Sequence, residues 1–236
     1  KETTGTLNGS TCTAYFDSTT GTLTLHNYNG KIIQSGTLGG AQDLTVKLKG
    51  ANTIDGSLEN KSGGDILITA DSAATLSITQ SGDTSQTLAG IATQISGLTT
   101  GPGSITIGGE AAITISATNT GEGKVYGIFA KQGVQILDSA SVDITATSYS
   151  TSDYYASGIY TVNQNLEFNT AGNIKIDCTA SQNKKPQAIR GADYDVTKVG
   201  TMTLQVTDDG FFYFGSNFNL GSTLAKNEGT LDGKKT

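Results

Sequence analysis

The residues best suited to chemistry are scarce in this chain and do not cluster along it. The single histidine, His26, has no second histidine or cysteine at zinc-ligand spacing. Asp193 and Asp195 flank a tyrosine and could offer oxygen atoms to calcium, but an Asp-x-Asp pair alone is a weak signal. We therefore expect no metal site, and calcium stays the one candidate cofactor.

Aromatic rings and the only arginine recur at one position of a short repeated element. Phe129, Tyr160 and Arg190 each follow an isoleucine, in Gly-Ile-Phe, Gly-Ile-Tyr and Ala-Ile-Arg. If the elements stack, these side chains form an outward ladder on which the C–H faces of a sugar can pack, while its hydroxyls bond to neighbouring amides and carboxylates. The alternative is that the ladder only stabilises the outside of the fold. Further tyrosines are expected in loops beside the ladder, and four of them join the candidate binding residues: Tyr126, Tyr154, Tyr155 and Tyr194.

The ladder positions belong to an internal repeat of short strands. Helical periodicity is absent, whereas alternating apolar and polar residues come in paired segments, such as 105–107 with 113–115. Repetition with three strands per unit and one connection of variable length predicts a single-stranded right-handed parallel β-helix rather than a propeller. The isoleucine of the third strand recurs after 37, 31 and 30 residues, at Ile91, Ile128, Ile159 and Ile189.

If successive coils lie directly on one another, aligned positions must form matching columns. Residues between the inward positions are polar and point outward, and Asp143 is expected to pair with Lys175. Cys178 is thereby a small buried side chain, out of reach of Cys12 several layers earlier. The expected inward columns hold apolar residues of similar size: Ile113, Val142 and Ile174; Ile115, Ile144 and Ile176; Ala117, Ala146 and Cys178.

The whole chain, residues 1–236, is predicted to form one domain of this repeat. Its N-terminal third has closer strand spacing, roughly 22 to 25 residues per turn, which indicates short connections. A solenoid must close its open core with something atypical, and an aromatic cluster lies in residues 211–218. Residues 211–236 are therefore predicted to form a C-terminal cap and tail.

Composition excludes several classes of protein. Only 15% of the residues are charged, against about 25% in ordinary soluble domains. A net charge of −6 with a single arginine argues against nucleic-acid binding, which depends on clustered Lys and Arg. No apolar run approaches the roughly 20 residues that span a bilayer, so no membrane insertion is expected.

Two segments carry a resemblance to a known family. Residues 21–29 read Gly-Thr-Leu-Thr-Leu-His-Asn-Tyr-Asn, and residues 43–54 read Asp-Leu-Thr-Val-Lys-Leu-Lys-Gly-Ala-Asn-Thr-Ile. The phrasing resembles bacterial cell-surface β-helical "carbohydrate-binding domain-containing" proteins, which share a right-handed β-helix similar to that of polysaccharide lyases. The resemblance implies a secreted, non-catalytic binder; some relatives bind plant cell-wall polymers, in cases with calcium. It transfers no functional residue to this chain.

The expected function is therefore an extracellular, secreted or cell-surface-attached binding or adhesion module that contacts a polysaccharide or a host or cell-wall glycan. One alternative is a structural adhesin stalk that binds protein or nothing specific. The other is a polysaccharide lyase or hydrolase. Against an enzyme, β-helical hydrolases of polygalacturonan use a Gly-His-Gly turn and an Arg-x-Lys pair, whereas His26 lies between Leu25 and Asn27, and Arg190 is followed by Gly and Ala. The ligand and the oligomeric state stay open.

Overall fold

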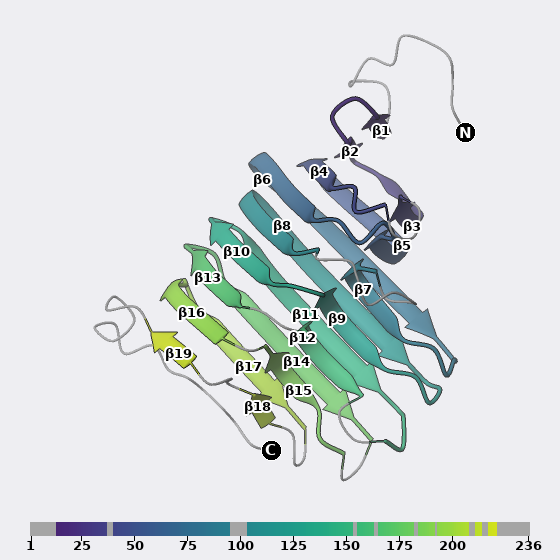
Figure 1. Cartoon of the computed structure of the whole chain (residues 1–236), viewed down its shortest axis with the longest axis vertical. Helices are drawn as coiled ribbons and strands as arrows, with labels where there is room; N and C mark the ends of the chain where they lie inside the picture. The colour runs from purple at the N-terminus through teal and green to yellow at the C-terminus, as the bar shows by residue number, and fades with distance from the viewer. Residues whose placement is uncertain are drawn as a thin grey trace.

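A single curled sheet of parallel strands makes up the described part of the chain. The computed structural model describes residues 13–36, 40–94, 103–152, 155–162, 165–181, 184–191, 193–207, 211–213 and 217–220, the last two stretches as backbone only. Within these ranges the regular elements are the strands β1 to β19, which form one hydrogen-bonded sheet. Figure 1 shows the strands stacked along one axis, which gives a solenoid-like shape. These ranges contain no helix long and apolar enough to cross a membrane.

The first of three columns of strands begins near the N-terminus. Each strand in it pairs in parallel with the strand one turn later, so that Leu44 pairs with Ile66 and Ile66 pairs with Ile105. β1 (Ala14–Asp17) is the exception, because it pairs antiparallel with the first strand of the column. The first column consists of β2 (Thr22–His26), β4 (Leu44–Lys49), the first part of β6 (Ile66–Gly82), the first part of β8 (Ile105–Asn119), β10 (Val134–Asp138), β13 (Leu166–Thr170), β16 (Asp193–Lys198) and β19 (Asn217–Leu220).

The second and third columns follow the same rule. The second contains the first parts of β3 (Asn29–Ser35) and β5 (Ala51–Asn60), the second parts of β6 and β8, then β11 (Ser141–Ser148), β14 (Ile174–Ala180) and β17 (Met202–Val206). The third contains the last parts of β3 and β5, then β7 (Leu88–Thr93), β9 (Val125–Ala130), β12 (Ala156–Thr161), β15 (Gln187–Arg190) and β18 (Phe211–Tyr213).

The predicted inward columns are confirmed. Val142 pairs with Ile113 on one side and with Ile174 on the other, and all three are buried. The neighbouring columns of Ile115, Ile144 and Ile176 and of Ala117, Ala146 and Cys178 keep the same register. Cys178 is a buried free thiol, and burial raises its pKa. Cys12 lies outside the described residues.

Outward positions carry polar side chains, as the alternation predicts. The Lys175 ammonium lies 3.4 Å from the Asp143 carboxylate on the neighbouring strand. Both side chains are about half exposed, so water screens the pair and its contribution to stability is at most about 1 kcal/mol. The register of the layers therefore depends on the buried columns rather than on surface charge.

Turns between the columns are held by buried asparagines. Asn119, at the end of β8, accepts hydrogen bonds from the backbone N–H groups of Thr84 and Gly121 and donates to the carbonyl of Thr84. One side chain thus ties the turns that lead into β7 and β9 to each other. These turns position the first residues of β7 and β9, two successive strands of the third column.

Of the residues predicted to form a C-terminal cap, the structure describes the backbone of two strands. β18 pairs with β15, and β19 pairs with β16, so both continue existing columns. The remaining residues of this predicted segment lie outside the described ranges.

Replacing Ile144 by Asn should lower the free energy of unfolding by about 3 kcal/mol or more, because the buried side chain becomes an amide without a partner. Thr145→Asn is the matched control, since Thr145 is the adjacent, exposed residue of β11, and it should stay within about 0.5 kcal/mol of wild type. Urea unfolding followed by circular dichroism measures both. Equal stability of the two variants would contradict the inward assignment.

Candidate functional site

The outer face of the third column carries an aromatic cluster that depends on a glycine. Strict alternation along β9 would place Tyr126 and Ile128 on the same face. Instead, Val125 and Ile128 belong to the main core, while Tyr126 and Phe129 belong to a separate cluster. A Cβ atom on the intervening Gly127 would lie 2.3 Å from Cγ2 of Ile144 and 2.6 Å from the Gly158 carbonyl oxygen. Because only glycine fits there, the backbone packs closely against the core, and both rings face outward.

The stacking register predicted for Phe129, Tyr160 and Arg190 is confirmed, and a third ring joins the ladder. Phe129 pairs with Tyr160, and Tyr160 pairs with Arg190, in successive layers. The Phe129 and Tyr160 rings are stacked at an interplanar angle of 4°, with centroids 5.7 Å apart. Tyr126 stacks on both, at 5.1 Å from Phe129 and 5.0 Å from Tyr160. We call Tyr126, Phe129 and Tyr160 the aromatic cluster.

Burial within the aromatic cluster is uneven. Tyr126 and Phe129 are 5% and 8% exposed, and Ala89 and Ala92 in the layer before are fully buried beside them. Tyr160 is only half-buried. Since parallel rings on neighbouring strands turn their faces toward each other, such a ladder offers mainly ring edges to a ligand. The cluster is thus a small packed core outside the main one, with Tyr160 at its accessible margin.

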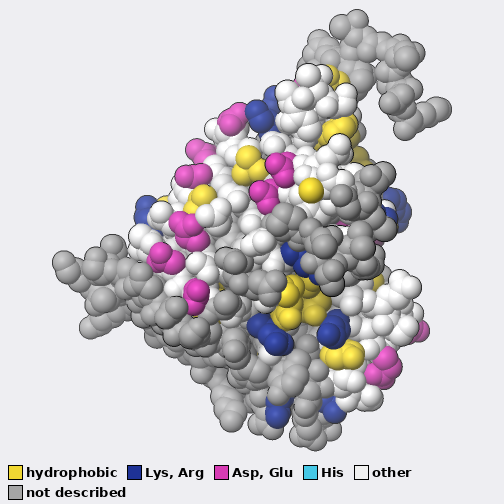
Figure 2. All heavy atoms as spheres, viewed as in Figure 1, with side chains coloured by type: hydrophobic (Ala, Val, Ile, Leu, Met, Phe, Trp, Pro, Cys, Tyr) yellow, Lys and Arg dark blue, Asp and Glu magenta, His cyan; other side chains and the backbone are white. Residues whose placement is uncertain are grey.

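Cationic side chains border the aromatic cluster. The Lys131 ammonium lies 5.6 Å from the centroid of Phe129, and the Arg190 guanidinium lies 5.1 Å from that of Tyr160. Lys124 lies 5.4 Å from the centroid of Tyr155, in the turn before β12. Figure 2 shows Lys and Arg side chains around a hydrophobic patch over the third column, while acidic side chains gather along another edge of the molecule.

A carboxylate fixes the turns beside the cluster. Glu122, just before β9, accepts hydrogen bonds from the backbone N–H and the hydroxyl of Thr151 and from the hydroxyl of Ser150. The backbone N–H of Thr151 is the largest cause that holds the pKa of Glu122 below its usual range, and Lys184 adds to it. The turn before β12, which presents Tyr155, is thereby tied to the turn before β9.

Two of the candidate tyrosines lie in strands, not in loops. Tyr126 is in β9 and takes part in the stack. Tyr194 is in β16, between Asp193 and Asp195, and its ring is 2% exposed in the main core. The loop prediction is wrong for both, and Tyr194 faces away from any outer surface. Tyr155 lies in the turn before β12, whereas Tyr154 lies outside the described residues.

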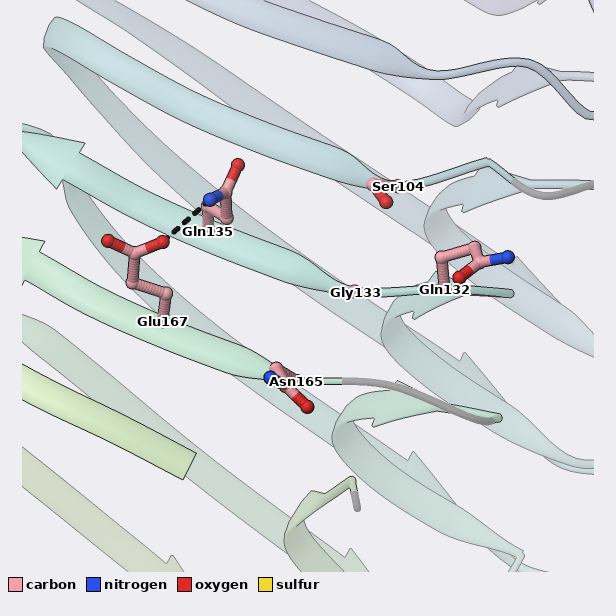
Figure 3. A pocket seen from close by; sticks show the side chains of 6 residues that line it. All are labelled: Ser104, Gln132, Gly133, Gln135, Asn165 and Glu167. Carbon is pink, nitrogen blue, oxygen red and sulfur yellow. Dashed lines mark hydrogen bonds between the residues drawn. The ribbon is translucent and has the colours of Figure 1, made fainter. Parts of the chain in front are cut away.

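A polar hollow lies at the N-terminal ends of three neighbouring strands of the first column, β8, β10 and β13. It has a volume of about 290 Å³. The Gln135 amide donates a hydrogen bond of 2.6 Å to the Glu167 carboxylate and accepts one from the Thr106 hydroxyl, so the side chains form a ladder across three layers. Figure 3 shows the hydrogen bond between Gln135 and Glu167 among the residues that line the hollow. The lining residues are Ser104, Gln132, Gly133, Gln135, Asn165 and Glu167.

One turn, residues 131–133, joins the polar hollow to the aromatic cluster. Lys131 lies over Phe129, while Gln132 and Gly133 line the hollow. The turn is anchored in the layer before it, because the Lys131 N–H donates to the Thr93 hydroxyl and the Gln132 N–H donates to the Gly103 carbonyl. Rings, cations, amides and a carboxylate are therefore held along one edge between the third and first columns.

The sequence prediction missed the lysines and the hollow. Lys124 and Lys131 read as ordinary surface residues, yet they stand directly before and after the strand Val-Tyr-Gly-Ile-Phe-Ala, which is the available signal. The hollow brings together Gln135 and Glu167 from segments 32 residues apart, and no local pattern marks either. In the described part of the chain, no group of three or more His, Cys, Asp or Glu side chains could hold a metal ion.

Comparison with known protein families, curated protein sequences and solved structures finds no match to this chain.

Phe129→Ala should lower the free energy of unfolding by about 3 kcal/mol, because it removes a buried ring from the aromatic cluster. Tyr160→Ala should cost less, about 1 kcal/mol, since that ring is half-buried and mainly loses stacking. Tyr149→Ala is the control, as its ring is 58% exposed. Urea unfolding measures all three, and equal costs for Phe129 and Tyr149 would contradict a packed cluster.

Alkaline pH should destabilise the protein partly through Tyr126. Burial, and secondarily the nearby Tyr160, raise the pKa of Tyr126 above its ordinary value. The folded state therefore favours the protonated phenol, and this contribution to stability is present below about pH 10 and is lost as the pH rises past it. A Tyr126→Phe variant lacks this ionisable group, so its unfolding free energy should fall less steeply than that of wild type above about pH 10. Parallel pH curves for variant and wild type would contradict the burial of a neutral phenol.

Proposed function

We propose that the chain is a right-handed parallel β-helix that serves as an extracellular, non-catalytic binding module for polysaccharide. The three parallel columns support the architecture, and parallel crossovers are almost always right-handed. The composition, poor in charge, and the resemblance of residues 21–29 and 43–54 to surface proteins support the location.

The proposed binding is supported by one observation: the turn 131–133 joins the aromatic cluster to the polar hollow. Sugars are bound by amide and carboxylate side chains that pair with their hydroxyls and by aromatic rings that contact their C–H groups. Gln132, Asn165 and Glu167 supply the polar groups, and Tyr160 supplies the accessible ring. We propose that a glycan lies along this edge, with hydroxyls in the hollow.

Ring edges rather than ring faces would meet the ligand in this proposal. Phe129 and Tyr126 already stack on the Tyr160 ring, and Arg190 lies over it. The Tyr160 margin and the Arg190 guanidinium would therefore contact the sugar through hydrogen bonds and edge contacts. Phe129 and Tyr126 would act indirectly, by holding Tyr160 in place.

The module is proposed to be non-catalytic because hydrolysis of a glycosidic bond ordinarily uses two carboxyl groups that flank the bond. Among the residues that line the hollow, Glu167 alone carries a carboxylate, and Gln135 already donates a hydrogen bond to it. This arrangement supports recognition of hydroxyls rather than acid–base chemistry.

The test is binding to insoluble polysaccharides and to a glycan array that contains neutral, carboxylated and sulfated members. We expect retention of wild type on at least one glycan and a loss of affinity of about fivefold or more for Tyr160→Ala and for Arg190→Ala. Tyr15→Ala is the matched control, since Tyr15 is an exposed tyrosine in β1 at the other end of the chain. Near-ultraviolet circular dichroism checks that each variant is folded.

Retention on no glycan would overturn the proposed function and favour the stalk alternative. If both variants bind the glycan as tightly as wild type does, the binding site does not lie at this edge. Release of reducing ends or unsaturated uronides from a bound glycan would show that the module is an enzyme instead.

A further inference from the structure

We propose that the site selects anionic glycans, whose carboxylate or sulfate groups bind Lys124, Lys131 and Arg190. This inference rests on the proposed function and names the class of polysaccharide.

The three cations surround the aromatic cluster on different sides. Lys124 precedes β9, Lys131 follows it, and Arg190 ends β15 two layers further on. Lys124 is exposed, and the other two are half-buried. Positive charge therefore meets the ligand at both ends of β9 and at the strand two layers further on.

Each of the three cations lies over the face of an aromatic ring, which positions its side chain. Lys124 lies over Tyr155, Lys131 over Phe129 and Arg190 over Tyr160, at 5.4, 5.6 and 5.1 Å from the centroids. A ring face holds a cation without neutralising its charge, so the ammonium groups of Lys124 and Lys131 keep N–H donors for an anion. Ordering these side chains in advance lowers the entropy that a ligand must remove.

Within the part of the chain that the structure describes, neither Lys124 nor Lys131 forms an ion pair. Glu122 is held by Ser150 and Thr151 in the turn beside Lys124. Glu59 lies on the same outer column but in the layer before Ala92, where its side chain is 5% exposed and accepts a hydrogen bond from Gln34. With a net charge of −6 for the whole chain, other surfaces repel a polyanion, which favours binding at the cation-bordered cluster.

The spacing of the cations favours a polymer over a small anion. Seven residue steps separate Lys124 from Lys131, which is about 23 Å of extended chain at about 3.3 Å per residue. One sugar unit cannot reach both ammonium groups, whereas an extended chain with repeated anionic groups can.

The experiment compares neutral, carboxylated and sulfated glycans on the same array, followed by titration of the tightest one. We expect the retained glycans to be anionic, and their affinity to fall when salt screens the charges. A variant with Lys124→Gln and Lys131→Gln should bind the anionic glycan about fivefold to tenfold more weakly. The matched control is Lys47→Gln, which removes one exposed charge from β4 in the first column and should bind as wild type does.

Several outcomes would overturn the inference. Equal retention of neutral and anionic glycans would contradict selection by charge but would leave the proposed function in place. An unchanged affinity of the lysine double variant would do the same. Displacement of the glycan by single-stranded DNA at equal charge concentration would show general polyanion binding instead. Retention of no glycan at all is the distinct failure of the proposed function.

Discussion

The direct stacking of each coil on the next is the constraint on which the rest of the molecule depends. Parallel hydrogen bonding between layers fixes which residues are neighbours, so a side chain at one position meets its counterparts about one turn earlier and later. The buried columns keep this register, because a slip of one residue would turn every apolar side chain of a strand outward. Ile113, Val142 and Ile174 illustrate the result, since each fills the space beside a residue of similar shape.

The same constraint explains why the aromatic cluster forms where it does. In the third column, Gly90, Gly127 and Gly158 each approach an isoleucine of the second column closely enough to exclude a Cβ atom. The close approach breaks the alternation, so two outward positions follow each other at a spacing of three residues. Alanines occupy both positions in β7, rings occupy both in β9, and Ser157 with Tyr160 occupies them in β12. Small neighbours in the adjacent layers leave space into which the rings can pack.

The features that follow from the internal repeat could be predicted from the sequence. The inward columns and the Phe129–Tyr160–Arg190 ladder were predictable, because equivalent residues recur at nearly constant spacing and alternate in polarity. Tyr194 was misplaced because polar Asp193 and Asp195 around it resemble a loop, although they are the outward residues of a strand whose central ring is buried. The stacking of Tyr126 was missed because strict alternation ignores the glycine beside it. The polar hollow could not be predicted, because it depends on how three turns of different length meet.

At the proposed site, structure and recognition need not compete for the same side chains. Phe129 and Tyr126 are buried, and their contribution is to hold Tyr160, Lys131 and Arg190 in fixed positions. A lysine over a ring loses little hydration on its outer side, so it stabilises the cluster and still presents donors to solvent. A chain with one arginine and a strong acidic excess has few cations to place. Because they lie over rings and next to a hollow lined by amides, charge, aromatic rings and hydrogen-bonding groups occur together at this edge.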